Sequence, residues 1–195
     1  ELSGSHQSRF FIYGDNVMDH VTHHVIIGGG PAGVIAAETI RKHAPSDTIT
    51  IVSDEKEPPY SRMAIPYLLM GNVDEHGTHL RKSPSHFTDL KLNVIQASVN
   101  TVDVASKKIA FNNGESINFD SLLIATGSNP MHPPIPGITS EGVHTCWTLE
   151  DARAIAKLAT QGARVLQLGA GFIGCIIMEA LATRGVMLTV VEMGD

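Results

Sequence analysis

Cysteine is scarce in this sequence, and its scarcity excludes two classes of site. Among 195 residues only Cys146 and Cys175 are cysteines, and they lie 29 positions apart. A dithiol redox centre or a zinc site of the usual spacing needs neighbouring cysteines, so neither is encoded here. Isolated cysteines are typical of proteins whose thiols stay reduced, and we therefore expect a cytoplasmic location.

Other features are missing as well. No apolar run approaches the ~18 residues of a membrane helix, and the start "ELSGSHQSRFFIYGDN" lacks the layout of a signal peptide. A net charge of -6 gives no electrostatic case for nucleic acid or an anionic membrane as partner. The chain begins with Glu1 and stops just after the strand-like "LTVVE". We therefore expect a piece of a longer protein.

What is present indicates a folded α/β chain. Apolar residues make up 43% of it, enough to build a core. The segment "HHVIIGGG" predicts a short strand running into glycine, and "PAGVIAAETIRKHA" predicts a helix that begins near Pro31 and stops at Pro45. The alternating, β-branched "DTITIVSDE" predicts the next strand. Strand, helix and strand in this order imply a parallel sheet.

The rest of the chain suggests a meander, a linker and a second unit of the first kind. Turn residues in "VASKK" and "NNG" separate short strands, and "SLLIATGSNP" predicts a buried strand that ends in a glycine turn. Prolines in "PMHPPIPG" mark a boundary, after which Thr148 caps a helix. We expect an irregular segment over 1–20 and a parallel-sheet domain with a small antiparallel β-meander over 21–133. A linker and the truncated start of a second parallel-sheet domain follow over 134–195.

Each unit contains the glycine pattern GxGxxG between its first strand and its helix. In the first unit Gly28 allows the tight turn, Gly30 lets the backbone approach a pyrophosphate, and Gly33 lets helix and strand pack closely. Pro31 and Ala32 fill the intervening positions, where the helix N-terminus attracts phosphate. An acid at the end of the next strand would bind the ribose, and the candidates there are Asp54 and Glu55.

The second unit repeats the pattern at Gly169, Gly171 and Gly174, with Phe172 and Ile173 between the last two glycines. Glu192 ends its second strand. A carboxylate there binds a free 2′-hydroxyl and repels a 2′-phosphate, so this site should prefer NADH to NADPH. Each pattern alone could be no more than a tight turn, but two of them in matching surroundings predict two dinucleotide sites, of the Rossmann-like kind.

In this arrangement the chain resembles the N-terminal part of the pyridine nucleotide-disulfide oxidoreductase superfamily, over residues 23 to 195. The resemblance implies FAD at the first site and NAD(P)H at the second. "FDSLLIATGSNP" is similar to the family segment whose glycine turn, here Ala125, Thr126 and Gly127, passes close to the FAD. "HTCWTLEDARAI" resembles the family's crossing into the nucleotide domain.

The segment "DEKEPPYSRMAIPY" indicates which branch of this superfamily the chain resembles. Where thiol-using relatives carry one or two cysteines, this chain has Ser61, Arg62 and Met63. It resembles the ferredoxin, rubredoxin and nitrite reductase flavoproteins, which implies that Arg62 lies near the FAD pyrophosphate; a solvated loop arginine is the alternative. Tyr67 and Ile176 stand where that branch usually has a lysine and a glutamate, and this departure puts the electron acceptor in doubt.

We therefore expect an FAD-dependent NAD(P)H oxidoreductase that passes hydride from NADH to the flavin and electrons on to an acceptor. The acceptor is a redox protein, a nitrite-reductase-type centre or a small molecule. No side chain is assigned as catalytic. One alternative is a thiol or disulfide reductase whose cysteine lies outside this segment, and another is a flavoprotein module that senses NADH. The resemblance also implies that the full-length protein is a homo-oligomer.

The remaining chemically notable side chains receive structural interpretations. We expect both cysteines to be packing groups and Glu179 to lie on a helix face, and we expect no metal site. We interpret the histidines as polar surface or loop residues; they are His20, His23, His24, His76 and His79. We interpret the side chains near Arg62 as core residues or as the lining of the flavin face; they are Met63, Tyr67 and Met70.

Overall fold

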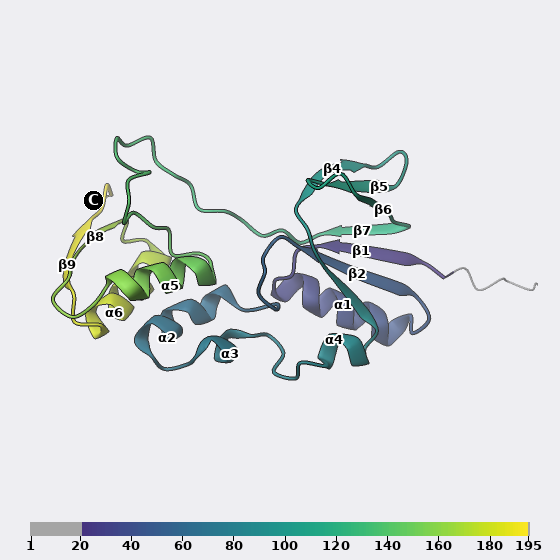
Figure 1. Cartoon of the computed structure of the whole chain (residues 1–195), viewed down its shortest axis with the longest axis horizontal. Coiled ribbons are helices and arrows are strands. Elements are labelled where there is room, and N and C mark those ends of the chain that lie inside the picture. The colour runs from purple at the N-terminus through teal and green to yellow at the C-terminus, as the bar shows by residue number, and fades with distance from the viewer. Residues whose placement is uncertain (1–20, 195) are drawn as a thin grey trace, which may run out of the picture.

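The computed structural model describes residues 21–194. The predicted irregular segment over 1–20, which includes His20, lies outside these residues. The described chain forms an elongated molecule of two lobes (Figure 1).

The first lobe contains a parallel sheet of four strands in the order β3-β2-β1-β7. Helix α1 makes the crossover between β1 and β2, which pair in parallel register from His23 with Thr48 to Ile27 with Val52. The predicted parallel unit is therefore confirmed. The elements are β1 (His23–Ile27), α1 (Pro31–His43), β2 (Thr48–Ser53), β3 (Leu92–Gln96) and β7 (Ser121–Ile124).

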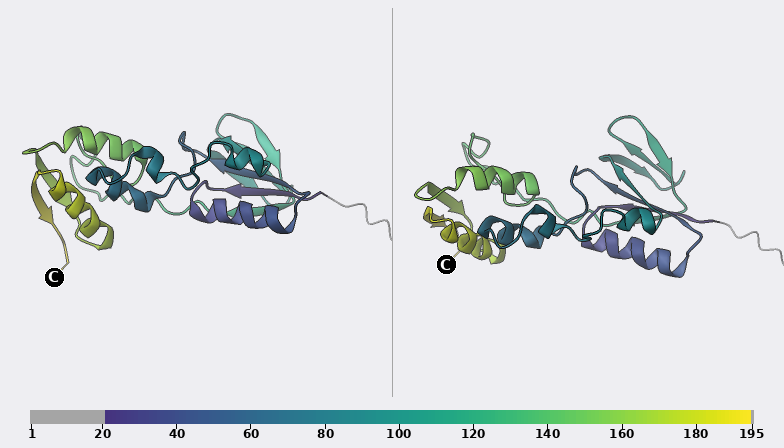
Figure 2. Two further views of the ribbon diagram at one scale, coloured as in Figure 1. Left: turned by 90° about the horizontal axis from the view of Figure 1, so that it is seen from below. Right: turned by 60° about the horizontal axis from the view of Figure 1, so that its bottom comes forward.

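The two faces of this sheet have separate cores. Successive strand residues point to opposite faces, so Val25 and Ile26 enter different clusters. One face is covered by α1 and the short helix α4 (His86–Asp89), and the other by the meander (Figure 2). The meander is antiparallel in the order β4-β5-β6, with β4 (Val99–Asp103), β5 (Lys108–Phe111) and β6 (Ser116–Asn118).

The second lobe holds the other parallel pair. Strands β8 and β9 pair from Arg164 with Met187 to Leu168 with Val191, and α6 crosses between them. The elements are α5 (Leu149–Leu158), β8 (Arg164–Leu168), α6 (Phe172–Thr183) and β9 (Met187–Val191). Together the two lobes confirm the predicted α/β fold class, in which a small antiparallel meander accompanies two parallel sheets.

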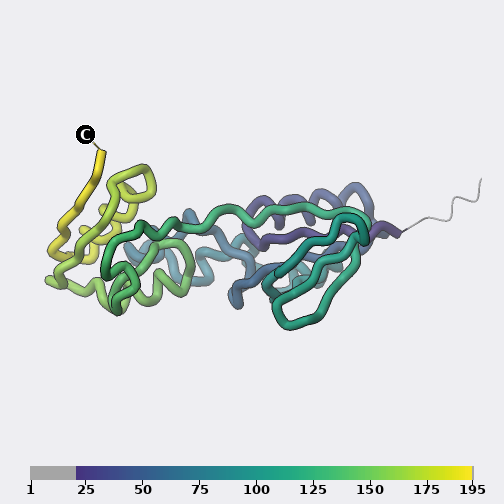
Figure 3. Tube along the Cα trace, turned by 90° about the horizontal axis from the view of Figure 1, so that it is seen from above, coloured from purple at the N-terminus to yellow at the C-terminus, as the bar shows by residue number. Residues whose placement is uncertain are grey.

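Two segments connect the lobes. Residues 125–147 run between them without a helix or strand, and the four prolines lie in this extended path (Figure 3). The other segment follows β2 and contains a 3-10 turn, η1 (Arg62–Ala64), and helices α2 (Ile65–Met70) and α3 (Glu75–Thr78). Ile65 and Leu69 of α2 are buried against Leu149, Ala152 and Ala180 of the second lobe.

Helices in the described part of the chain are too short, or not apolar enough, to cross a membrane.

Candidate functional site

The first glycine turn lies at the carboxyl end of β1, where the chain enters α1. Gly28 has a positive φ of +123°, and its N–H donates to Val52 O at 2.8 Å. A Cβ on Gly28 would lie 2.2 Å from Ala125 O, and one on Gly33 would lie 2.0 Å from Gly28 O. These two glycines are therefore required by the close approach of backbone to backbone.

Gly30 differs, because a Cβ placed there would meet no atom of the described residues within 4 Å. Gly30 is the N-cap of α1, and no side chain caps the helix. The first bond of the helix runs from Val34 N to Gly30 O, so the amides of Ala32 and Gly33 precede the ladder. With Pro31 at the first helical position, this helix N-terminus has amide donors without partners among residues 21–194, and it fits a pyrophosphate.

The turn of residues 125–127 lies against this glycine turn. Ala125 N donates to Ile27 O at 2.8 Å, which continues the pairing of β7 with β1. Gly127 has a φ of +69°, and a Cβ on it would also meet open space. The fold thus brings together Gly28 and Ala125–Thr126–Gly127. The sequence analysis predicted, from two different motifs, that both segments lie at the same cofactor.

The two acids expected at the ribose have different surroundings. Asp54 is exposed and has no hydrogen-bond partner among the described residues, so its carboxylate is available. Glu55 accepts from Arg62 Nη2 at 2.6 Å and from the Tyr60 hydroxyl. The structure therefore commits the Glu55 carboxylate to protein partners.

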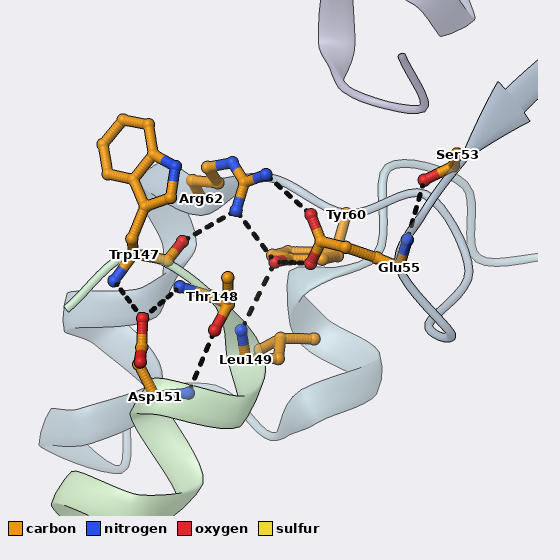
Figure 4. A network of polar contacts seen from close by, with 8 residues as sticks. All are labelled: Ser53, Glu55, Tyr60, Arg62, Trp147, Thr148, Leu149 and Asp151. Carbon is orange, nitrogen blue, oxygen red and sulfur yellow. Dashed lines mark hydrogen bonds and ion pairs between the residues drawn. The ribbon is translucent and has the colours of Figure 1, made fainter. Parts of the chain in front are cut away.

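Arg62 forms part of a network that joins the lobes (Figure 4). Its Nη1 donates to Trp147 O at 2.9 Å and to the Tyr60 hydroxyl at 3.2 Å. Its guanidinium lies 5.2 Å from the centre of the Trp147 ring, within cation–π range. The Tyr60 hydroxyl also accepts from Leu149 N, and burial together with the bond to Glu55 raises the pKa of Tyr60 well above its usual value.

Sequence reasoning identified Arg62 but missed Tyr60 and Trp147. The available signals were the aromatic in "PPYSR" and the presence of a single tryptophan in the chain. Neither signal shows that both residues contact Arg62, because 87 positions separate them.

The second glycine turn repeats the first at the carboxyl end of β8. Gly169 has a φ of +97°, and its N–H donates to Val191 O at 2.8 Å. In the part of the chain that the structure describes, a Cβ on Gly171 would meet nothing within 4 Å, whereas one on Gly174 would lie 2.6 Å from Gly169 O. No side chain caps α6, and Phe172 and Ile173 are exposed in its first turn. This turn also fits a phosphate-bearing ligand.

Glu192 lies beside this turn and bonds to backbone amides. Its Oε2 accepts from Ala170 N, and its Oε1 accepts from Met193 N at 2.7 Å and Gly194 N at 3.1 Å. These bonds, led by the one from Ala170, lower the pKa of Glu192, so the carboxylate stays charged at neutral pH.

One hydrogen bond that occurs in both glycine turns shows which of their residues correspond. Gly28 N donates to Val52 O as Gly169 N donates to Val191 O, so Ser53 in the first unit occupies the place of Glu192. Asp54 and Glu55 lie one and two residues beyond that place.

The remaining candidates of the sequence fall outside a common site. Tyr67 on α2 is exposed, and Ile176 on α6 is half-buried. Burial raises the pKa of the Cys146 thiol to about 12, so this thiol is unreactive at neutral pH. Cys175 is exposed, and its Sγ lies 3.2 Å from Ala170 O, to which it donates. Glu179 is exposed on α6, as predicted.

The histidines described by the structure have local partners. His23 hydrogen-bonds to Thr50, and His24 hydrogen-bonds to Asp47. His76 and His79 contact each other edge to face. No three potential metal-binding side chains converge within residues 21–194.

Comparison with known proteins assigns the family. Residues 22–195 match the family model described as pyridine nucleotide-disulphide oxidoreductase, and the chain belongs to this family. The resemblance seen in the residues is thereby confirmed.

Individual relatives agree with this assignment. The chain is 36% identical over 177 residues to an NADH oxidase of Methanocaldococcus jannaschii, covering 87% of this chain and 40% of that protein. It is 34% identical to human apoptosis-inducing factor 3, covering 89% and 28%. The structure of an NAD-dependent persulfide reductase from A. fulgidus superposes with a TM-score of 0.80 at 33% identity, covering 89% and 34%. The chain thus spans less than half the length of each of these relatives.

Proposed function

We propose that the chain is part of an FAD-dependent NAD(P)H oxidoreductase, which oxidises NADH and reduces an electron acceptor. The observation that carries this proposal is the presence of two glycine turns of the same construction in one chain. Each turn has two glycines that a positive φ or close packing requires, and a third, Gly30 or Gly171, that neither of these requires. Two such turns suit a flavin and a nicotinamide dinucleotide, and the family assignment supports FAD and NAD(P)H as these cofactors.

The first turn would hold FAD. Gly30 and the amides of Ala32 and Gly33 would receive the pyrophosphate, the segment Ala125–Gly127 would lie along the cofactor, and Asp54 would accept a bond from the ribose. Arg62 would act near this pyrophosphate, from the network that holds it to Glu55 and Trp147. When bound, FAD supplies the ability to accept a hydride and release electrons. The chain's own residues supply binding and orientation.

The second turn would hold the nicotinamide nucleotide, with NADH preferred over NADPH. The charged Glu192 at the end of β9 would repel a 2′-phosphate and accept a bond from a 2′-hydroxyl. We predict that Glu192→Arg shifts the ratio of kcat/KM for NADH over NADPH toward NADPH by at least about tenfold. Steady-state kinetics with both nucleotides measure this ratio. Unchanged strong preference for NADH would contradict the assignment of Glu192.

The proposed acceptor is a redox protein or a small oxidant. Among the relatives are an NADH oxidase and, at 29% identity, the ferredoxin–NAD(+) reductase subunit of a Pseudomonas putida benzene dioxygenase system. Beside Arg62 the chain has Ser61 and Met63 and no thiol, and Cys146 is half-buried with a raised thiol pKa, which supports electron exit without a cysteine at either position.

A second candidate is a thiol or persulfide reductase whose cysteine lies outside residues 1–195. The likeness to the persulfide reductase structure favours it. Titrating the thiols of the full-length protein before and after reduction with NADH would distinguish the candidates. New accessible thiols after reduction would support the second candidate, and an unchanged number would support the first.

Residues 21–133 are proposed as the first part of the FAD-binding domain, and residues 134–195 as the linker and start of the nucleotide-binding domain. The proposed setting is a homo-oligomer in the cytoplasm.

The test of the proposed function is an anaerobic absorption spectrum of the full-length protein, before and after one equivalent of NADH or NADPH. We expect flavin bands that bleach faster with NADH. A colourless protein that takes up no added FAD would contradict the proposal. Slow turnover with every acceptor would favour the NADH-sensing alternative.

A further inference from the structure

We propose that Gln167 and Glu192 clamp the peptide group between Gly169 and Ala170 from opposite ends, and that Gln167 is thereby a positioning residue for the nicotinamide nucleotide. This inference rests on the proposed function of the second glycine turn. It concerns a strand residue that the glycine pattern does not include.

Gln167 is the fourth residue of β8, and its side chain points to the half-buried face of the strand. Its Nε2 donates to Gly169 O at 2.8 Å and to Gly174 O at 3.0 Å. The amide therefore ties the first and last glycines of the pattern together. The orientation of the amide is determined by these partners, because an Oε1 in place of Nε2 would face two carbonyl oxygens.

The other end of the same peptide group is held by Glu192. The carbonyl of Gly169 and the N–H of Ala170 belong to one peptide plane, and Ala170 N donates to Glu192 Oε2. With Gln167 on the oxygen and Glu192 on the hydrogen, the plane has a fixed orientation. Cys175 adds a bond to the next carbonyl, that of Ala170, at 3.2 Å.

The first glycine turn shows that such a clamp is not needed for folding. The position equivalent to Gln167 is Ile26, a fully buried apolar residue two places before Gly28. The position equivalent to Glu192 is Ser53, whose hydroxyl accepts from Glu55 N instead. A turn of this shape therefore closes with an apolar side chain beneath it.

Gln167 also carries an energetic disadvantage that an apolar residue would avoid. Its Oε1 is buried and has no hydrogen-bond partner within the described residues. Burying an unpaired acceptor is unfavourable, and such groups in native proteins usually have a specific reason. Here the reason is the pair of bonds that its Nε2 makes to the glycine turn.

A fixed peptide group favours binding of the nucleotide. Gly169 has a positive φ of +97°, in the region that favours glycine. A glycine in a turn has many conformations available in the unbound protein, and fixing them before binding lowers the entropy lost when the pyrophosphate docks.

The test uses full-length protein with Gln167→Ile, which introduces the residue of the first turn. Gln167→Glu keeps the size of the side chain but replaces the donor with a charged acceptor. Gln96→Ile, on the exposed side of β3, is the matched control. The readouts are the Kd of NAD+ by calorimetry, the FAD content by absorbance, and KM and kcat for NADH.

We expect Gln167→Ile to raise the Kd of NAD+ and the KM of NADH roughly tenfold, which corresponds to the loss of one or two hydrogen bonds. Gln167→Glu should weaken binding at least as much. FAD content and kcat should stay within about twofold of the wild type, and the control should match the wild type in every readout.

Two results would overturn the inference. A wild-type Kd for NAD+ in Gln167→Ile would show that the clamp does not position the nucleotide. An equal loss of FAD and NAD+ in both Gln167 variants would show that the amide serves the fold as a whole. If the wild-type protein itself binds neither cofactor, the proposed function fails instead, so the two failures are distinguishable.

Discussion

Gly28 and Gly33 leave no room for a side chain, whereas the space beside Gly30 is open. This difference separates glycines that the fold requires from a glycine that a ligand requires. A side chain on Gly28 would collide with the backbone of Ala125, and one on Gly33 would collide with the backbone of Gly28. Replacement of either glycine therefore forces the backbone to move. Replacement of Gly30 fills only the space in front of the helix N-terminus.

We predict that Gly30→Val abolishes FAD binding without unfolding the protein. The two methyl groups would occupy the approach to the α1 amides, and the Kd for FAD should rise at least about a hundredfold. Flavin absorbance of the purified variant measures this loss, and circular dichroism measures the fold. Full flavin occupancy in Gly30→Val would show that the cofactor does not approach this turn.

Gly33→Val is the matched comparison. Its Cβ would lie 2.0 Å from Gly28 O, so we expect loss of the folded state rather than a selective loss of flavin.

At the scale of elements, α5 begins with a capping box. Thr148 Oγ1 accepts from Asp151 N at 3.1 Å, and Asp151 Oδ2 accepts from Thr148 N at 3.0 Å. The pair satisfies two amides that the helix itself leaves unbonded. It also fixes the direction in which the chain enters the second lobe after the extended link.

Thr148→Ala should lower the free energy of unfolding by about 1 kcal/mol, because one cap bond is lost. Thr148→Ser should retain most of the stability. Urea denaturation measures both, with Thr160→Ala, at an exposed position just after α5, as control. Equal stability of Thr148→Ala and the wild type would contradict a stabilising role of the cap.

Glu38 on α1 binds α4 and the loop before it. Its carboxylate accepts from Arg81 Nε at 2.7 Å and Nη2 at 2.6 Å, and from His86 Nε2 at 2.8 Å. The bonds from Arg81 lower the pKa of Glu38, against the opposing effect of burial. The folded state therefore favours the charged carboxylate.

This lowered pKa predicts a pH dependence of stability. The contribution of Glu38 is fully present above the pKa of the unfolded chain, about 4.3, and is lost as the pH falls through the lower pKa of the folded state. Glu38→Gln should be less stable than the wild type at pH 7, and the difference should shrink below about pH 4. Urea midpoints across this range measure it. A difference that grows on acidification would have the wrong sign.

At the scale of the whole molecule, Arg184 connects α6 with α5 of the second lobe and with α2 of the segment that follows β2. At the end of α6, its guanidinium donates to Leu69 O, Ala156 O and Ala159 O at distances of 3.0, 2.6 and 2.8 Å. The acceptors lie at the carboxyl ends of α2 and α5, where carbonyls lack partners within their helices. Since α2 follows the sheet of the first lobe, this contact helps join the two lobes.

We predict that Arg184→Met destabilises the protein by roughly 2 kcal/mol or more, because charged donors to several carbonyls are lost. Hydrogen exchange should rise in residues 65–70 and 149–158 and stay unchanged in β1 and β2. Arg164→Met, at an exposed position of β8, is the control. An increase in hydrogen exchange that is equal in both lobes of Arg184→Met would show that the contact does not hold α2 specifically.

Features that depend on neighbouring residues were predictable from the sequence. The glycine spacings 28-30-33 and 169-171-174 predicted both turns, because a strand that enters a helix through a tight turn needs those backbone conformations locally. The Thr148 cap and the absence of helix and strand at the prolines of residues 125–147 follow from equally local chemistry. The family and the fold class were therefore readable from the residues.

Only the tertiary structure decided the partners of the polar side chains. Sequence position made Asp54 and Glu55 equivalent, but the fold commits Glu55 to Arg62 and leaves Asp54 exposed. Arg62 meets Trp147, 85 residues away, because α2 lies on the second lobe. Such contacts depend on how separate elements pack, and no local pattern records that. The clamp of Gln167 has the same origin: strand alternation places its side chain under the turn, and only the folded turn presents two carbonyls to its single donor group.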